Sequence, residues 1–446
     1  MALAGPRKHT TPTPEPTASP GGTRPVYVLG GNRIPFTKSG GAYKDASNLD
    51  MLGAAVAGLV ARYGLAGERL GLLAAGAVLK HSKDFNLARE TVLAGALSPE
   101  TPGLDVQMAC ATGMEAVTTV ADRIRLGRID SGIAGGTDST SDAPIVVTDD
   151  LRRALMALNR ARTPGERLKA LASIRPGHVK PVAPTTAQPR TGLWMGEHQA
   201  ITTAEWGITR EAQDELARDS HHRLAAAWDA GFFDDLVTPY RKVVKDAILR
   251  PDTSLEKLAS LKPVFGRSLE AEATMTAGNS TALSDGASAV LLGSAEWAAA
   301  RGITPLARFV DAETAAVDFV HGRDGLLMAP VHAAPRLLAR HGLTLADFDF
   351  VEIHEAFAGT VLSTLAAWES EEFCRERLGL PGALGSIDRA RLNVHGSSLA
   401  AGHPFAATGG RIVASLAKTL HERGGRGLVS VCAAGGQGVV AILEAA

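Results

Sequence analysis

Two cysteines and two histidines in this sequence occupy positions where side chains commonly carry out chemistry. Cys110, Cys432 and His354 each follow a short apolar run, and His403 precedes a proline and an expected helix. A cysteine combined with a histidine indicates acyl transfer through a thiolate, because the histidine can remove the thiol proton. The second cysteine lies outside any Cys-x-x-Cys pattern, so it suggests a proton-transfer group rather than a redox partner.

Cys110 has the surroundings of a nucleophile. It lies between an expected strand over 104–106 and a helix that begins near Gly113. The positive end of a helix dipole favours a thiolate there, and the small neighbours Ala109 and Ala111 let a substrate approach the sulfur. The alternative is a buried structural thiol, which is the commonest fate of a free cysteine.

The other two cysteines have different surroundings. Cys432 precedes the small residues 433–436, which let another group approach the backbone, and its alternative is a core cysteine before a glycine turn. Cys374 lies in an expected charged helix over 371–378, and we predict that it takes no part in chemistry.

The two histidines suggest acid–base work rather than metal binding. Gly402 and Pro404 restrict the backbone on either side of His403, which makes it a candidate base or oxyanion donor, with a plain surface histidine as the alternative. The zinc pattern that His354 begins needs a second histidine four residues later, but that residue is Ala358, so we reject zinc. The sequence has no cluster with metal-ligand spacing, P-loop or helix-opening G-x-G-x-x-G, so no metal, ATP or dinucleotide is expected.

The composition excludes several classes of protein and of binding partner. Hydrophobic residues make up 45% of the 446 residues and charged residues 21%, which is typical of globular proteins. Lys+Arg 46 against Asp+Glu 47 gives a net charge of -1, so no general charge attraction drives binding to nucleic acid or an anionic membrane. No apolar run reaches the roughly 18–20 residues of a membrane helix. Three cysteines suit a reducing compartment, and we predict a cytoplasmic protein.

The elements that must position these residues alternate between strands and helices. This predicts an α/β fold with a parallel or mixed sheet covered on both faces. Interleaved prolines predict a disordered tail over 1–24, followed by an N-terminal half over 25–147 with 283–304 and a C-terminal half over 305–446. Two short basic helices and turn-rich stretches predict an inserted domain over 148–282 that rests on the sheet layers.

A weak internal similarity supports the division of the chain into two similar halves. Residues 104–136 and 392–436 each read as strand, loop, long helix and glycine-ended strand. This similarity suggests halves that each place a reactive residue at the start of a helix. Chance similarity of two such units is the alternative.

Four motifs in order resemble those of the thiolase family, from about Val26 to the C-terminus. They are an acyl-enzyme loop, a pantetheine-facing segment, a histidine motif and a second cysteine motif, which are Gln107–Met114, Asn279–Ala287, Gly402–Pro404 and Cys432–Gly436. The resemblance implies a five-layered αβαβα fold of two related halves, with a CoA-binding loop domain over 148–282. It also implies a homodimer or tetramer.

Two departures narrow the resemblance. His354-Glu355-Ala356-Phe357 stands where most thiolases have Asn-Glu-Ala-Phe, and Cys-Ala-Ala-Gly-Gly replaces the commoner Cys-x-Gly-Gly-Gly. Both forms, and the basic helices of 150–180, resemble the β-subunit of fatty-acid-oxidation trifunctional complexes and its bacterial relatives. This resemblance implies degradative thiolysis in β-oxidation and a hydratase/dehydrogenase α-subunit as a partner.

The resemblance also assigns roles, with CoA and 3-ketoacyl-CoA as substrates and no cofactor. Cys110 attacks the 3-keto carbon after giving its proton to His403. Cys432 protonates the acetyl-CoA enolate and later takes the proton of a second CoA. The backbone amides of Cys110 and Ala434 form one oxyanion hole, and His403 with His354 forms the other, where His354 either holds a water or donates directly.

CoA contacts are assigned by the same resemblance. Met195 and Thr281 match pantetheine contacts, Arg250 matches an arginine near the nucleotide end, and Leu283 belongs to the pantetheine-facing segment. A core methionine, a turn threonine and a solvated arginine are the structural alternatives for the first three.

Three rival functions stay open. A decarboxylating ketosynthase shares the fold but would not need Cys432 as an acid. A non-catalytic thiolase-like protein would only bind acyl-CoA or a partner. A biosynthetic thiolase would run the reaction toward acetoacetyl-CoA.

Overall fold

The computed structural model of the protein describes residues 23–182 and 187–446. The predicted disordered tail therefore lies, up to residue 22, outside the described residues. Arg24 is described and belongs to the fold, because its Nε donates to Ile124 O at 2.7 Å and its Nη2 pairs with Asp130 at 2.7 Å. Extending the tail to residue 24 was thus wrong at its last residue.

The centre of the fold is one large mixed sheet. Its strand order is β10-β11-β12-β9-β1-β8-β5-β3-β4, and β2 pairs with β8. Among the described strands, β3 with β4, β3 with β5, and β10 with β11 run parallel and the other pairs run antiparallel, so the sheet is mixed. The strands are β1 (Val26–Arg33), β2 (Thr37–Lys38), β3 (Leu72–Ala75), β4 (Gly103–Asp105), β5 (Ser131–Ser139), β8 (Ser284–Gly293), β9 (Ala307–Ala316), β10 (Phe350–Ile353), β11 (Arg426–Ala433) and β12 (Gln437–Ala445).

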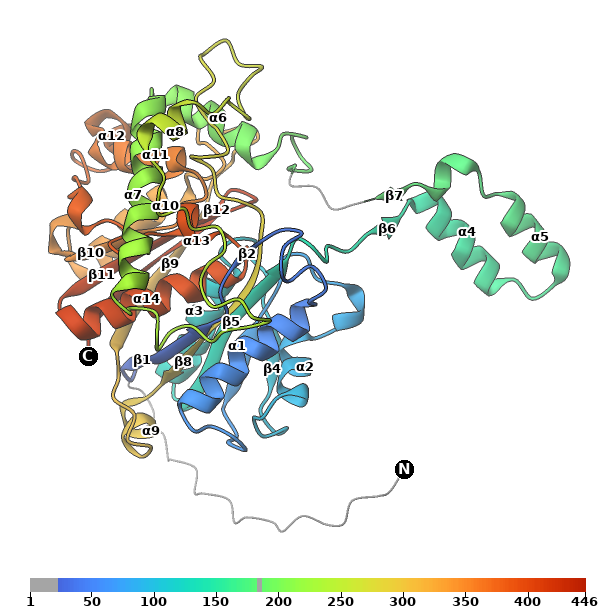
Figure 1. The fold of residues 1–446 in the computed structure, drawn as a ribbon, viewed down its shortest axis with the longest axis horizontal. Coiled ribbons are helices and arrows are strands. Elements are labelled where there is room, and N and C mark those ends of the chain that lie inside the picture. Colours follow the sequence, from blue (N-terminus) through green and yellow to red (C-terminus); the bar gives the residue numbers. More distant parts are fainter. Residues whose placement is uncertain (1–22, 183–186) are drawn as a thin grey trace.

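Helices cover this sheet in layers (Figure 1). The outer helices α1 and α2 pack on β1, β3, β5 and β8, and the outer helices α10 and α11 pack on β9 to β12. Between the two parts of the sheet lie α3 and α14, which share a third apolar core with strands of both parts. This arrangement is the expected αβαβα layering. The helices are α1 (Asn48–Arg62), α2 (Leu87–Ala94), α3 (Thr112–Arg125), α10 (Ala329–His341), α11 (Ala358–Glu369) and α14 (Ala407–Arg423), with short α9 (Ala295–Ala299) and α12 (Glu371–Leu378) at the edges and short α13 (Ser398–Ala401) buried in the interior.

The two central helices touch at their N-terminal ends. Residues 407–420 of α14 are buried on every side, as expected for a helix enclosed by sheets and another helix. A side chain on Gly113 would collide with Ala406 O, and one on Gly409 would collide with Met114 N, so glycine permits this close approach. The two similar segments expected from the sequence, 104–136 and 392–436, therefore contain the two central helices. The strand expected at the start of the second segment is only an isolated bridge at Leu392.

The segment expected as an inserted domain divides into two parts. Helices α6 (Met195–Glu205) and α7 (Arg210–Asp229) pack against α11, and α7 also contacts α8 (Leu255–Ala259) and α13. This part rests on the body of the molecule, as predicted. The domain boundaries themselves stay a prediction.

The other part projects from the body as an arm, which we define as residues 146–182 (Figure 1). It contains β6 (Val146–Val147), α4 (Asp149–Arg160), α5 (Pro164–Ala172) and β7 (Pro181–Val182). The two basic helices are confirmed, but the expectation that the whole inserted domain rests on the sheet layers is wrong here. The physical reason is that α4 buries only Ala154 and α5 buries only Ala170. Each helix therefore has a narrow apolar stripe, which is enough to pack against the other arm helix but not against the sheet layers.

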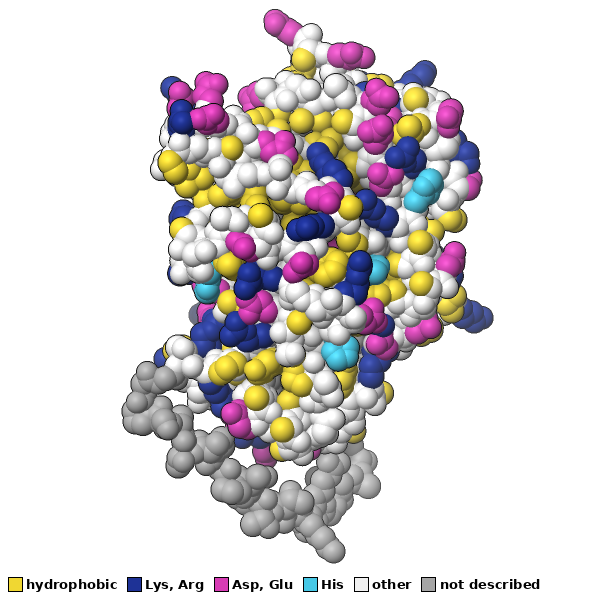
Figure 2. Space-filling model, turned by 90° about the vertical axis from the view of Figure 1, so that its left-hand side faces the viewer, with side chains coloured by type: hydrophobic (Ala, Val, Ile, Leu, Met, Phe, Trp, Pro, Cys, Tyr) yellow, Lys and Arg dark blue, Asp and Glu magenta, His cyan; other side chains and the backbone are white. Residues whose placement is uncertain are grey.

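The surface carries charges of both signs. Figure 2 shows Lys and Arg side chains interleaved with Asp and Glu side chains on the face that includes α12 and β10. Within the described ranges, no helix combines the length and apolar character that crossing a membrane requires.

Candidate active site

A strained turn presents Cys110 between β4 and α3. Ala109 has a φ of 45°, which is unusual for a residue other than glycine. Thr112 Oγ1 holds the turn, because it accepts from Met108 N at 2.9 Å and donates to Ala109 O at 2.7 Å. The half-buried Cys110 lies at the tip of this turn, two residues before α3 begins. Non-glycine strain of this kind persists where the surroundings determine it, as at catalytic residues.

The environment of Cys110 favours the neutral thiol in the free protein. Burial raises its pKa to about 11, the nearby Ala434 N–H lowers it, and the Asp138 carboxylate raises it. Burial thus opposes the thiolate that the start of the helix is expected to favour, and the expectation stays a prediction. The Cys110 thiol therefore needs a base to remove its proton. The Ala434 N–H can then help to stabilise the thiolate that forms.

His403 is held so that one ring nitrogen is free. Its backbone N–H donates to Ser284 Oγ at 3.1 Å, and its Nδ1 is hydrogen-bonded to Thr408 Oγ1 at 2.6 Å. Its Nε2 is buried and has no partner among the described residues. Burial, reinforced by the charge of Arg411, lowers the pKa of His403 to about 3. The ring is therefore neutral at pH 7, with Nε2 open to a substrate or to the Cys110 proton.

His354 lies beside His403 although the two are on different elements. It follows β10, its backbone N–H donates to Ser430 O at 2.8 Å, and its ring centroid is 4.2 Å from that of His403. Its Nδ1 is 2.9 Å from Ser398 Oγ, and its Nε2 has no partner among the described residues. Across residues 23–182 and 187–446, no group of three or more His, Cys, Asp or Glu side chains is arranged to hold a metal ion.

Cys432 completes the group at the end of β11. It is buried, and it packs in an apolar cluster with Met195, Ala356 and Phe357. Burial and then the neighbouring Cys110 raise the pKa of Cys432 well above that of a free thiol. The thiol is thus a neutral proton donor at pH 7, and its conjugate thiolate is a strong base.

Asp138 joins the nucleophile half to the histidine half, and sequence reasoning missed it. Its carboxylate accepts from Val78 N at 2.9 Å, from Leu79 N at 2.7 Å and from Ala406 N at 2.9 Å. Ala406 lies in the loop between His403 and α14, so this contact fixes the histidine loop against β5. Burial raises the pKa of Asp138 to about 7, while the three N–H groups lower it. The available signal was the one charged residue in a strand of small and otherwise uncharged residues.

The predicted pantetheine-facing segment passes between the two histidine motifs. Thr281 N donates to Ala356 O at 3.1 Å, and Thr281 Oγ1 donates to Ser398 O at 2.8 Å. Leu283 forms an isolated bridge with His403 and is 51% exposed. The hydroxyl hydrogen of Thr281 is therefore used within the fold, whereas the Leu283 side chain is open to a ligand.

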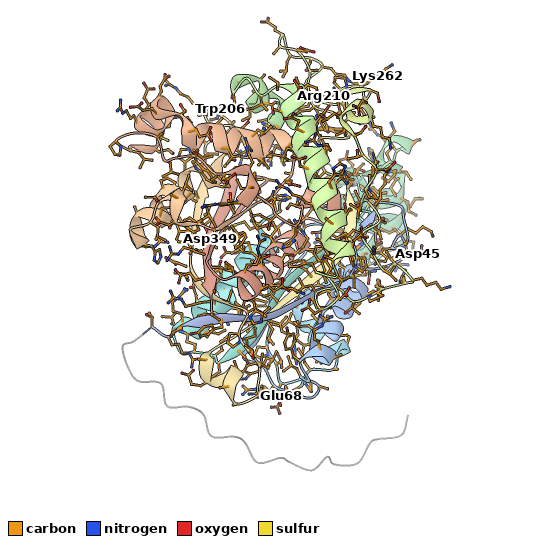
Figure 3. The ribbon with its side chains drawn as sticks, turned by 60° about the vertical axis from the view of Figure 1, so that its left-hand side comes forward. Asp45, Glu68, Trp206, Arg210, Lys262 and Asp349 are labelled. Carbon is orange, nitrogen blue, oxygen red and sulfur yellow. The ribbon has the colours of Figure 1, made fainter. Side chains whose placement is uncertain are left out.

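The same segment is anchored to α7. Asn279 Nδ2 donates to Asp214 Oδ1 at 2.9 Å, and Asp214 Oδ2 pairs with Arg210 at 2.7 Å. Figure 3 shows Arg210 at the upper end of α7. Sequence reasoning did not identify this chain of contacts, which ties the part of 148–282 on the body to the site.

Arg250 lies at the edge of the site rather than within the group. Its segment is anchored by a buried ion pair of 2.6 Å between Arg33 and Asp246, and Ile248 lies against Gly402. The Arg250 side chain is exposed, and its backbone N–H donates to His221 Nδ1 at 3.2 Å. The structure thus gathers Cys110, His354, His403, Cys432, Ala434, Met195, Thr281 and Leu283, and it places Arg250 on the nearby surface.

Known proteins match the chain along nearly its whole length. Residues 26–296 match the family "Thiolase, N-terminal domain" and residues 303–445 match "Thiolase, C-terminal domain". A 3-ketoacyl-CoA thiolase of Pectobacterium carotovorum is 42% identical over 94% of this chain and 96% of its own. One from Yersinia pestis is 40% identical over the same shares.

Solved structures agree. Human mitochondrial 3-ketoacyl-CoA thiolase superposes with a TM-score of 0.77 at 29% identity, over 95% of this chain and 99% of that one. The Bacillus anthracis acetyl-CoA acetyltransferase superposes with a TM-score of 0.76 at 30% identity, over 95% of this chain and all 100% of its own. Because these matches run through both halves and all four motifs, the chain belongs to the thiolase family.

Proposed function

We propose that the protein is a 3-ketoacyl-CoA thiolase, which cleaves its substrate with CoA into acetyl-CoA and an acyl-CoA two carbons shorter. The observation that carries the proposal is that Cys432 and the Ala434 N–H lie beside Cys110, while the ring of His403 lies beside that of His354. The names of the matched relatives support this substrate class. CoA is a substrate, and the mechanism uses no cofactor.

In the first half-reaction the Cys110 proton moves to His403 Nε2, and the sulfur attacks the 3-keto carbon. The backbone N–H groups of Cys110 and Ala434 stabilise the resulting oxyanion; one such donor is commonly worth about 10²–10³ in rate. The bond between C2 and C3 then breaks and leaves its electron pair on C2 of an acetyl-CoA enolate. Cys432 gives its thiol proton to that carbon, while the rings of His403 and His354 face the enolate oxygen.

In the second half-reaction the Cys432 thiolate takes the thiol proton of a second CoA. Its raised pKa makes that thiolate a strong base, which favours the transfer. The CoA sulfur attacks the acyl group on Cys110, and the departing Cys110 sulfur recovers its proton from His403. His403 has returned the proton of Cys110, and Cys432 has replaced the proton it gave to the enolate with that of CoA, so the protein is unchanged.

CoA is proposed to lie along the segment around Leu283. Met195 packs beside Cys432 and Thr281 lines the same region, which supports pantetheine contacts there. The exposed cation of Arg250 suits a phosphate or adenine group at the rim. We also propose a homodimer or tetramer and a role in fatty-acid β-oxidation, which rest on the family resemblance, and a cytoplasmic location, which rests on the low number of cysteines.

A hydratase/dehydrogenase α-subunit is the proposed partner. Its support is the His354 form of the motif and the exposed basic side chains of the arm, including Arg152, Arg153 and Arg160. Such charges can meet an acidic surface on another protein.

The proposal is tested by trapping the intermediate. Incubation with a 3-ketoacyl-CoA without free CoA, followed by peptide mass analysis, is expected to show an acyl group on Cys110. An adduct on Cys374 instead would contradict the assignment. Thiolysis rates over a series of 3-ketoacyl-CoA chain lengths then separate degradation from acetoacetyl-CoA synthesis.

A further inference from the structure

A buried arginine lies behind the two histidines, and the proposed reaction does not use it. Arg411 on α14 donates from Nη2 to Ser398 Oγ at 2.9 Å and to Ser397 Oγ at 3.1 Å. Ser398 Oγ is in turn 2.9 Å from His354 Nδ1. These four side chains are at most 5% exposed, so bulk water does not reach their polar atoms; Arg411 Nε and His354 Nε2 have no partner among the described residues.

The arginine determines the direction of the hydrogen bond between Ser398 and His354. A guanidinium only donates, so it occupies one lone pair of the Ser398 hydroxyl. Among the described residues, the hydroxyl hydrogen then has one acceptor within reach, which is His354 Nδ1. If the bond ran the other way, from an Nδ1–H, a fully buried hydroxyl hydrogen would have no acceptor. The Ser398 hydroxyl therefore donates, and the ring proton of a neutral His354 is on Nε2.

The surroundings also keep the His354 ring neutral. Burial lowers its pKa well below the usual value, and the charge of Arg411, together with that of His403 whenever His403 is protonated, lowers it further. Arg411 itself stays cationic at pH 7, because burial lowers its pKa only to about 10 while Glu352 and Glu355 raise it. The other charged groups close to Arg411 are Arg33, which lowers its pKa, and Asp246, which raises it.

We propose that Arg411 and Ser398 are positioning residues that hold His354 as the Nε2–H tautomer, so that its ring donates a hydrogen bond to the enolate oxygen of acetyl-CoA. His354 is then a direct donor, and His403 is the only base of the pair. The tautomer itself follows from the contacts, whereas its use on an enolate rests on the proposed function. The unpartnered Nε2 atoms of both rings, whose centroids are 4.2 Å apart, leave the two nitrogens available for one substrate oxygen.

Neutron diffraction of the full-length free enzyme tests the tautomer without reference to activity. The expected result is deuterium on His354 Nε2 and a Ser398 hydroxyl deuterium directed at Nδ1. Deuterium on His354 Nδ1 would overturn the proposal even if the enzyme is a thiolase. Conversely, the expected protonation in a protein without thiolase activity would leave the tautomer intact and refute only the proposed function.

A matched pair of serine variants tests the consequence for catalysis. Ser398→Ala removes the hydroxyl that faces His354, whereas Ser397→Ala removes the other acceptor of Arg411 and leaves the His354 contact. We expect Ser398→Ala to lower kcat for thiolysis by roughly 10- to 100-fold with KM for CoA within about twofold, as for loss of one oriented donor. Ser397→Ala is expected to keep both constants near wild type.

A hydroxyl-retaining variant separates orientation from packing. Ser398→Thr keeps the donor and is expected to recover most of the kcat that Ser398→Ala loses, with thermal unfolding recorded for each protein. Equal kcat losses in Ser397→Ala and Ser398→Ala would overturn the catalytic part of the proposal. So would a folded Ser398→Thr protein that is no faster than Ser398→Ala. If Ser398→Thr does not fold, the comparison of the two alanine variants decides.

Discussion

The catalytic centre and the arm use polar side chains in opposite ways. In the centre, the buried Asp138 accepts from Ala406 N, 268 residues away in sequence, and the buried Arg411 reaches His354 on another element through Ser398. In the arm, the 2.8 Å pair between Arg152 and Asp149 joins neighbours on one helix, with side chains 54% and 70% exposed. An exposed pair of this kind adds little to stability, because water and salt screen it.

This difference in burial indicates that substitutions of polar residues affect function and stability more in the catalytic centre than in the arm. A buried polar group that loses its partner keeps its desolvation cost, whereas an exposed group is taken up by water. Substitutions in the centre are therefore expected to be severe, and substitutions in the arm mild. Each of the following experiments can sharpen that contrast or remove it.

The largest effect is expected for the nucleophile. Cys110→Ala should lower thiolysis by roughly 10⁴-fold or more, as observed when a covalent nucleophile is removed. Steady-state assays with a short-chain 3-ketoacyl-CoA measure it. Cys374→Ala is the control, because Cys374 is buried on α12 with its sulfur donating to Ala367 O at 3.4 Å. That variant should lose stability but keep its activity per folded molecule.

Cys432→Ala should lower thiolysis by about 10²–10⁴-fold, which is typical for loss of a general acid–base group. Because Cys432 serves both the enolate and the incoming CoA, acylation and deacylation should both slow in single-turnover experiments. If Cys432→Ala slows neither step, Cys432 is not the acid–base group, and the decarboxylating ketosynthase becomes the better hypothesis.

Alkylation of Cys110 is expected to depend steeply on pH. Its pKa is raised to about 11, so only a small fraction is thiolate at pH 8, and that fraction rises about tenfold for each unit of pH. Iodoacetamide labelling of the free enzyme, followed by mass analysis of the Cys110 peptide, should keep accelerating above pH 9. A rate that levels off below pH 9 would show that the helix dipole outweighs burial after all.

Asp138 should give the protein a measurable dependence of stability on pH. Its folded pKa of about 7 exceeds the ordinary value of 3.8, so the folded state binds this proton more tightly than the unfolded state. Stability is therefore highest below pH 4 as far as this group is concerned, and it falls as pH rises from about 4 to 7. Urea midpoints at pH 5 and 7.5 should show that slope in the wild type and a reduced slope in Asp138→Asn. An identical slope in both proteins would contradict the assignment.

The smallest effect on catalysis is expected in the arm. Reversing Arg152, Arg153 and Arg160 to Glu should leave kcat, KM for CoA and the unfolding temperature nearly unchanged, because these side chains are solvated. Pull-down of a hydratase/dehydrogenase partner at low salt should weaken. A raised KM for CoA with unchanged protein association would show instead that the arm guides the anionic substrate.

The sequence by itself determined the mixed α/β character, the two basic helices and the reactive residues at strand ends and helix starts. Each depends on a local pattern, such as alternating strand and helix stretches, helix caps or a short motif, and such patterns act within a few residues. Thr148 and Thr163, for example, cap the two arm helices through their side chains, and Thr163 also forms a capping box with Glu166. The motif order also sufficed to identify the family.

Only the tertiary structure decided how these residues behave. The approach of His354 to His403, the Asp138 contact to Ala406 and the link from Arg411 through Ser398 all join segments that no local pattern relates. The rise in the Cys110 pKa and the projection of the arm likewise depend on how much water the packed chain excludes. Burial results from the packing of all the layers together, and for that reason the sequence pattern around a single residue does not determine its charge state or its partners.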